Sequence, residues 1–242
     1  MSRKRLIITA IVLVLVLAIG GILAYFTDSQ TVENTFKMSN VDIEVKEPGF
    51  PNETITIGPN DFVTKNPYIE NKSSGNVYAF MEVAIPVANV ATESNPTVTE
   101  RELFKVQHIT SEEGVTPVTY DNGINSGWVK IEGPTAKTID EVKYNVYVYA
   151  YATSSTDQAT SETTTTLTEL GYQQGANTTS TIFDGVQFID AKEVARDSSV
   201  LQDKDWKVIV TGHGIQTTGL GLDNITPEAV WNLVKTNVVV GR

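Results

Sequence analysis

The sequence predicts an all-β protein: a jelly-roll-like antiparallel β-sandwich with a few short helices, preceded by an N-terminal signal helix. Three observations support this class. Several short segments alternate apolar and polar residues, which is the pattern of half-buried strands. Turns rich in Gly, Pro and Asn separate these segments, and few segments have the spacing of a helix. Many short strands with such turns are typical of an antiparallel sandwich, and 242 residues suffice for one large domain of this kind.

A basic N-terminus and a long apolar run open the chain. Met1 to Arg5 carries three positive charges, and the run from Leu6 to Leu23 follows it. A positive segment, an apolar segment and then the small residue Ala24 are typical of a secretory signal peptide. We therefore predict that residues 1–24 are a signal peptide, cleaved between Ala24 and Tyr25, and that the protein is secreted to the extracellular matrix or cell surface. The alternative is a retained anchor, because the run is at the lower limit of a bilayer span.

Charge and cysteine content exclude several kinds of partner and site. Removal of residues 1–24 takes the formal net charge from −11 to −14, because three positive charges and no negative one are lost. So acidic a chain repels phosphates, and we expect no nucleic-acid partner. The chain has no cysteine, which excludes disulfides, thiolate nucleophiles and zinc–thiolate sites. Stability must then come from the core or from assembly with other copies.

The first strands are expected soon after the apolar run. Val41–Val45 and Thr54–Ile57 alternate apolar and polar residues, and Gly58–Asp61 has the composition of a turn. Val77–Val87 is a longer strand pattern, and Pro86 places its end at a sheet edge or a bulge.

The strongest strand pattern runs from Val142 to Ala152. One of its faces carries three tyrosines, Tyr147, Tyr149 and Tyr151. Such a face can bind glycans or a partner sheet, although packing between sheets is the alternative. Another strand is expected over Trp206–Ile215.

Two helices and one long excursion complete the expected domain, residues 38–242. Thr226–Lys235 has an N-cap residue, a proline at the first helical position and a lysine in its last turn. Thr99–Gln107 is a weaker helix candidate. Residues 152–181 are rich in Ser and Thr and predict a surface excursion, with a short helix near Leu167–Leu170.

Signals of catalysis are scarce. The two histidines, His108 and His213, are far apart in the sequence, and both are interpreted as structural. Glycines flank His213 and would allow close backbone approach or a bulge. The chain has no zinc-protease helix motif, no nucleophile elbow and no phosphate-binding loop. We therefore predict no enzyme, no catalytic residue, no metal and no cofactor.

The junction after the apolar run resembles the start of a known group of proteins. Ala24–Asp28 leads into Asn34–Ile43, and Ile57–Asp61 follows. Further segments that carry the resemblance are 69–71, 74–77, 128–129, 147–149, 181–186, 212–216 and 227–231. In this order they resemble the TasA/camelysin family of SipW-dependent exported proteins of Gram-positive bacteria. They are most similar to its BsaA-type biofilm matrix fibre subunits.

The resemblance implies a jelly-roll sandwich that a SipW-type signal peptidase releases at the cell surface. Copies would then join head to tail into biofilm matrix or pilus-like fibres, with an accessory anchor or minor subunit as a further partner. Some camelysin relatives are described as metallopeptidases, but this chain lacks a histidine ligand pair, so that activity is not expected.

In such fibres the N-terminal segment of one copy adds as a strand to the next, and residues 25–37 suit this role. The residues of this donor segment expected to make the contacts are Phe26, Asp28, Val32 and Phe36. A segment with few charges and no Pro or Gly can satisfy an open sheet edge. Head-to-tail addition does not close, so it gives filaments. The alternative is that the segment folds back on its own domain.

Two other functions stay open at this point. The chain could be a monomeric cell-surface adhesin or a carbohydrate-binding β-sandwich that uses the tyrosine face. A secreted hydrolase is the third possibility, for which the sequence supplies no recognisable motif.

Overall fold

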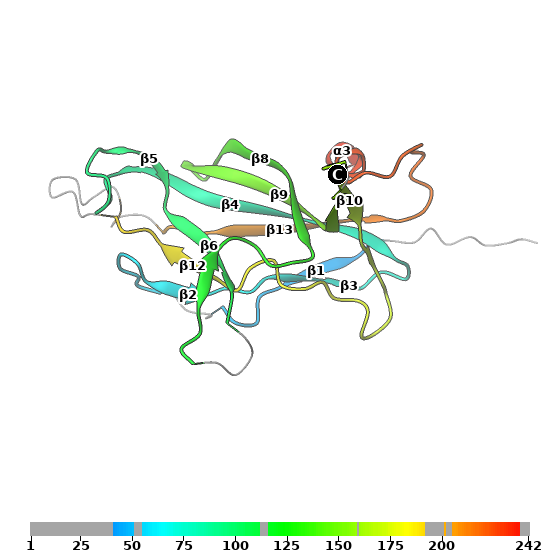
Figure 1. The fold of residues 1–242 in the computed structure, drawn as a ribbon, viewed down its shortest axis with the longest axis horizontal. Coiled ribbons are helices and arrows are strands. Elements are labelled where there is room, and N and C mark those ends of the chain that lie inside the picture. The colour runs from blue at the N-terminus through cyan, green and yellow to red at the C-terminus, as the bar shows by residue number, and fades with distance from the viewer. Residues whose placement is uncertain are drawn as a thin grey trace, which may run out of the picture. The chain divides into compact units, whose positions relative to one another are not determined.

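The structure is a computed structural model that describes residues 41–50, 55–111, 116–158, 160–191, 201 and 205–237. A seven-stranded antiparallel sheet faces a four-stranded and a two-stranded sheet, and helix α3 covers the other side of the large sheet (Figure 1). The predicted signal peptide and donor segment lie outside the described residues. No helix within the described ranges has the length and apolar character that a bilayer crossing requires.

The large sheet is organised around β4. Its strands are β4 (Val77–Val90), β5 (Thr99–Glu102), β8 (Trp128–Ile139), β9 (Val142–Thr156), β10 (Thr163–Leu167), β11 (Glu169–Leu170) and β13 (Ile209–Gln216). One side of β4 pairs with β9, and the other side pairs first with β13 and then with β5. Strand β9 pairs with β8 along its other edge and with β10 near its C-terminal end.

The smaller sheets lie on one side of the large one. The four-stranded sheet contains β2 (Phe62–Thr64), β12 (Gly185–Phe188), β6 (Phe104–Ile109) and β7 (Tyr120–Asn122), in that order. The two-stranded sheet pairs β1 (Ile43–Lys46) with β3 (Tyr68–Asn71). The fold class predicted from the sequence, an all-β antiparallel sandwich, is confirmed.

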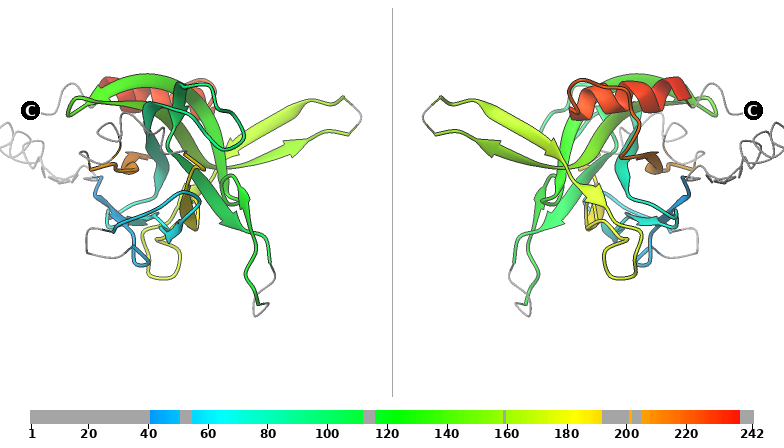
Figure 2. Two further views of the ribbon diagram at one scale, coloured as in Figure 1. Left: turned by 90° about the vertical axis from the view of Figure 1, so that its left-hand side faces the viewer. Right: turned by 90° about the vertical axis from the view of Figure 1, so that its right-hand side faces the viewer.

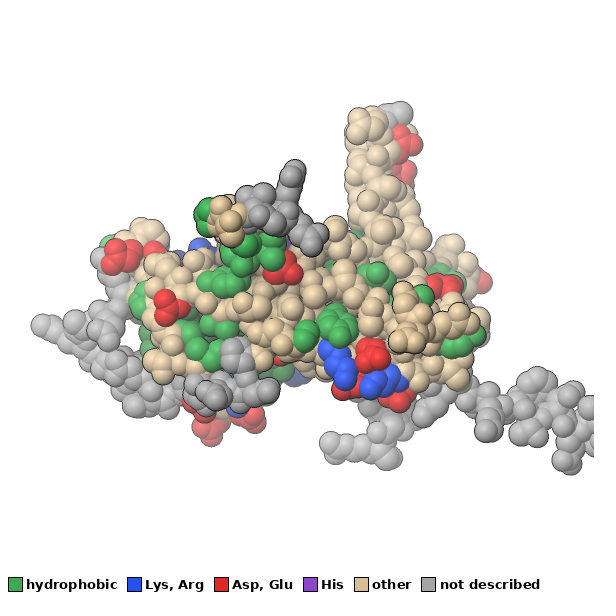
Figure 3. Space-filling model, turned by 90° about the horizontal axis from the view of Figure 1, so that it is seen from below, with side chains coloured by type: hydrophobic (Ala, Val, Ile, Leu, Met, Phe, Trp, Pro, Cys, Tyr) green, Lys and Arg blue, Asp and Glu red, His purple; other side chains and the backbone are tan. Residues whose placement is uncertain are grey.

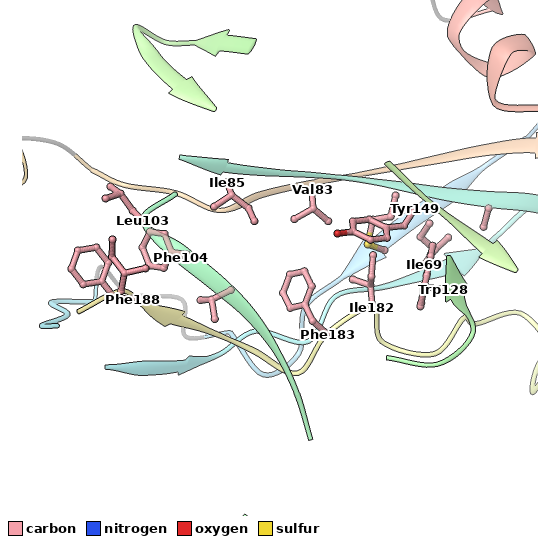
Figure 4. Close-up of a cluster of buried hydrophobic side chains, with 14 of the residues drawn as sticks. Ile69, Val83, Ile85, Leu103, Phe104, Trp128, Tyr149, Ile182, Phe183 and Phe188 are labelled. Atoms are coloured by element: carbon pink, nitrogen blue, oxygen red, sulfur yellow. The ribbon is translucent and has the colours of Figure 1, made fainter. Parts of the chain in front are cut away.

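The main core fills the space between the large and small sheets (Figure 4). Phe183, Ile182 and Ile69 are fully buried in it, and the rings of Phe104 and Phe188 meet edge to face at 5.4 Å. A second cluster lies on the opposite face of β4 and β9, beneath α3. Strand β4 is thus buried on both faces, which explains why its sequence is almost continuously apolar.

Two predicted helices are strands, and part of one predicted strand is irregular. Thr99–Gln107 forms β5 and the start of β6, and Leu167–Leu170 forms the end of β10 and β11. Residues 55–57 have no strand structure, while the following turn is present with a 3.1 Å hydrogen bond from Asp61 N to Gly58 O. Pairing with β4 overrides the local helical preference of the charged residues in β5.

The sequence predicts that the strand ends near Pro86, at a sheet edge or bulge, but β4 continues through Pro86 to Val90. The Pro86 carbonyl accepts a hydrogen bond from Leu103 N (2.9 Å), so the Pro86 nitrogen also points to the side of β5. On that side of β4, the pairing with β13 extends as far as Ala84, and the pairing with β5 starts at Val87. The reciprocal bond that Pro86 cannot donate leaves no acceptor unpaired, because Leu103 O accepts a hydrogen bond from Ile189 N (3.0 Å).

The Ser/Thr-rich excursion is largely a β-hairpin. The end of β9 pairs with β10 and reaches away from the sandwich (Figure 2). At its base Ala152 and Leu167 are opposite each other and buried.

Helix α3 (Pro227–Asn237) begins as the sequence predicts. Thr226 Oγ1 accepts a hydrogen bond from Ala229 N (3.2 Å), and Pro227 is the first helical residue. Val230, Trp231 and Val234 are buried against the large sheet.

Charged side chains form ion pairs on the outer face of β1 and β3. Lys46 and Lys72 both contact Glu44 and lie 3.9 Å from Glu70. Figure 3 shows Lys/Arg and Asp/Glu side chains gathered together on this side of the sandwich. The hydrogen bonds from Lys46 and then Lys72 lower the pKa of Glu44 to about 2. Exposed pairs of this kind contribute little to the stability of the fold.

Candidate assembly site along the edge of strand β13

Strand β13 is an edge strand of the large sheet. It pairs with β4 over its whole length, and it has no second hydrogen-bonded partner among the strands that the structure describes. The N–H and C=O of a residue in an antiparallel strand point to one side, and that side alternates along the strand. Thr217 N donates to Asn76 O, next to β4, at 3.3 Å, so the even-numbered residues of β13 face outward. The open edge therefore presents the backbone groups of Val210, Gly212, Gly214 and Gln216.

An apolar groove of about 440 Å³ borders this edge. Its apolar lining comes from four parts of the chain: Val41, Ile215, Leu220, and Leu233 with Val234. Unpaired backbone groups beside apolar pockets are what an added strand requires, since the main chain provides hydrogen bonds and alternate side chains fill the pockets.

Two glycines let β1 lie close to β13. A Cβ on Gly212 would be 2.6 Å from Cγ2 of Val45, and one on Gly214 would be 3.0 Å from Cγ2 of Ile43 and 3.1 Å from Cγ1 of Val41. This is the close approach that the glycines around His213 predict. It brings Val41 to the groove.

Helix α3, which forms one wall of the groove, is fastened to the sheet by polar contacts. His213 Nε2 lies 3.0 Å from Glu82 Oε2, and the His213 ring meets the Trp231 ring edge to face at 5.2 Å. Trp231 Nε1 and Lys235 Nζ both donate to Glu132 Oε2, at 3.0 and 2.9 Å. Through these contacts His213 links β4, β13 and α3.

Replacement of Glu82 by Gln should lower stability in a pH-dependent way. The hydrogen bond with His213 is the main cause that lowers the pKa of Glu82 below its usual range. A carboxyl group with a lowered pKa in the folded state stabilises the fold above its unfolded pKa, and this stabilisation is lost as the pH falls through the folded value. Urea titrations should show Glu82→Gln about 1 kcal/mol less stable than the parent near pH 7. The difference should begin to shrink near pH 4, the usual range of a glutamate, and vanish only below the lowered pKa of Glu82. A difference of the same size at both pH values would contradict this role.

The tyrosine face of β9 is turned toward the main core. Tyr149 is 7% exposed, and Tyr147 and Tyr151 pack against the same cluster. Tyr147 Oη donates to Glu102 Oε1 at 2.5 Å. Burial raises the pKa of Tyr149 to about 12. This placement favours the packing role over glycan binding.

The other predicted site residues lie outside the described residues. They are the cleavage residues Ala24 and Tyr25 and the donor residues Phe26, Asp28, Val32 and Phe36. The sequence reasoning did not identify the acceptor: Leu233 and Val234 have the spacing of the apolar face of a helix, but that pattern does not reveal a groove.

The histidines do not meet. His108 lies on β6, opposite Asp121 of β7, whereas His213 lies on β13 of the large sheet. Within the described ranges no three side chains of the His, Cys, Asp and Glu types form a group that could hold a metal ion.

Comparisons with known proteins give one family. Neither the curated proteins nor the solved structures contain a match. A family model described as camelysin metallo-endopeptidase matches residues 3–219, which is most of the chain and includes the whole apolar run and all strands up to β13. The chain therefore belongs to the camelysin metallo-endopeptidase family, the TasA/camelysin family that its sequence resembles.

Proposed function

We propose that this chain is a secreted structural subunit of extracellular biofilm matrix or pilus-like fibres. After cleavage near Ala24 by a SipW-type signal peptidase, residues 25–37 of one copy add as a strand to the β13 edge of the next. The observation that carries this proposal is the open edge of β13 beside an apolar groove. Family membership is consistent with an exported matrix protein.

The lengths of donor and acceptor agree. Strand β13 has 8 residues. A strand rises about 3.3 Å per residue, so a donor of the same length covers the edge and leaves several residues of the 25–37 segment to cross to a neighbouring copy. The alternating Phe26, Val32 and Phe36 side chains share one face of an extended segment and are suited to an apolar groove.

The histidines and carboxylates that the structure describes do not fit the metal site that the family description implies. A catalytic zinc site takes three protein ligands, most often with two or more histidines. The only two histidines of the chain lie in different sheets, and the described ranges contain no three-ligand cluster. The proposed function is therefore structural and non-enzymatic.

Two truncated chains test strand donation. The chain without residues 1–24 should form filaments visible by electron microscopy and pelleted by ultracentrifugation. The chain that also lacks residues 25–36 should stay monomeric, and a synthetic 25–37 peptide should bind to it whereas a scrambled peptide should not. Filaments from the shorter chain would show that donation by this segment is wrong. Monomers from the longer chain would instead indicate that the segment folds back on its own domain.

A further inference from the structure

The hairpin formed by residues 153–166, here called the arm, contributes nothing to the core. Described side chains of its strands beyond Ala152 are exposed on both faces, apart from the half-exposed Thr165. Ten of its 14 residues are Ser or Thr. In Figure 3 the arm is a projection without apolar side chains along it. An isolated two-stranded ribbon is marginally stable in water, so a third strand would stabilise it.

The outer edge of β10 has free backbone groups at defined positions. Thr168 N donates to Tyr151 O and Asp157 N to Glu162 O, both at 2.9 Å. These bonds fix the alternation of the ladder, so the groups of Thr163 and Thr165 point away from β9. At these two positions the side-chain hydroxyls of the paired strands meet. The Thr165 hydroxyl lies 3.0 Å from that of Ser154, and the Thr163 hydroxyl lies 3.1 Å from that of Thr156.

This edge lacks the features by which proteins protect exposed strands. Edge strands are commonly blocked by Lys, Pro or bulges. The outer edge of β8 has all three: Lys130 and Lys137, Pro134, and register shifts on both sides of Glu132. Strand β10 reads Thr-Thr-Thr-Thr-Leu and pairs in unbroken register. It carries no charge in a chain whose formal net charge is −11, so it is a strand that copies can approach without mutual repulsion.

We propose that the arm is a self-pairing surface, in which the outer edge of β10 joins the same edge of a second copy, antiparallel, across a two-fold axis. Centred on Thr164, this pairing sets Thr163 of one copy opposite Thr165 of the other, and both present outward backbone groups. Glu162 then faces Thr166 of the second copy, so no carboxylates are opposed. The same strand is complementary to itself, as a two-fold interface requires.

The contact is weak for a pair of chains, because it involves few backbone hydrogen bonds. It becomes strong when many arms are held along one filament, since linked sites bind at a high effective concentration. The arms would then link filaments side by side, whereas strand donation would link copies end to end. This lateral role rests on the proposed function, but arm pairing itself does not.

Cysteine substitution tests the pairing without interference, because the chain has no cysteine. Thr164→Cys places thiols at the two-fold axis, in a non-hydrogen-bonded pair whose Cα atoms are about 4.5 Å apart, which a disulfide can bridge. Ser155→Cys is the matched control, since it lies opposite Thr164 on the same arm but on the inner strand. Its thiols would be about 14 Å apart across the pair, beyond disulfide reach.

With the chain that lacks residues 1–24, mild oxidation should give disulfide dimers of Thr164→Cys at least about tenfold faster than of Ser155→Cys. Equal rates would overturn arm pairing. This result does not depend on filaments. If filaments form, Thr165→Lys should leave their length unchanged and abolish side-by-side bundles in electron micrographs. Unchanged bundles, or an arm that binds matrix glycans and not a second copy, would also overturn it.

Discussion

Leu233→Glu should block polymerisation of the chain that lacks residues 1–24, whereas Asn232→Glu should not. Both residues are on α3 and both changes add one negative charge. Leu233 lines the groove, while Asn232 is exposed. An added strand would bury the new carboxylate at position 233 among apolar side chains, at a cost of about 3 kcal/mol. This corresponds to roughly a hundredfold rise in the concentration at which filaments appear.

The measurement is the critical concentration of each variant, from pelleting and electron microscopy. Urea titration provides the control, because Leu233 is only half-buried and its replacement should leave most of the stability intact. Equal critical concentrations for the two glutamate variants would exclude the groove as the acceptor.

A second variant covers the case in which Leu233→Glu does not fold. Gln216→Pro removes one outward N–H of β13 without removing a bond to β4. Its control, Gln216→Ala, retains the N–H. The proline variant alone should raise the critical concentration, and equal behaviour of the two would contradict strand addition at this edge.

Local signals in the sequence predicted the local features of the fold. The cap and proline of Thr226 and Pro227 predicted the start of α3, because capping depends only on neighbouring residues. The period-two patterns of β4 and β9 predicted which side chains share a face. They could not show that both faces of β4 are buried, since the element that packs on the second face is α3, which lies far along the chain. For the same reason the tyrosines of β9 were assigned to one face without evidence that this face is buried.

The candidate site could not be predicted from the sequence, because it depends on pairing between segments that are far apart in the chain. Gln216 pairs with Val77, and the groove brings Val41 to Leu220 and Leu233. Whether a strand is central or at an edge depends on the whole sheet. The alternation of apolar and polar residues within one segment does not show it. The arm shows the converse: its composition predicted exposure, but only the register of β9 and β10 shows which backbone groups are free.

The packing of β1 against β13 places Val41 in the lining of the groove. Gly212→Ala should disturb this packing strongly. The new Cβ would lie 2.6 Å from Val45 Cγ2 and 3.4 Å from the fully buried Ile69, and a β-branched side chain has little freedom to move away. Overpacking of this kind should cost about 2–3 kcal/mol of unfolding free energy in urea titrations. Gly214→Ala, whose nearest contact is 3.0 Å, should cost less.

A double-mutant cycle identifies the cause. Val45→Ala removes the atom that Gly212→Ala would strike, so the double variant should be at least about 1 kcal/mol more stable than the sum of the two single changes predicts. Simple additivity would mean that Gly212 is needed for a reason other than the approach of β1. If the coupling is found, the single variant Gly212→Ala should also polymerise poorly, because displacement of β1 moves Val41, which lines the groove.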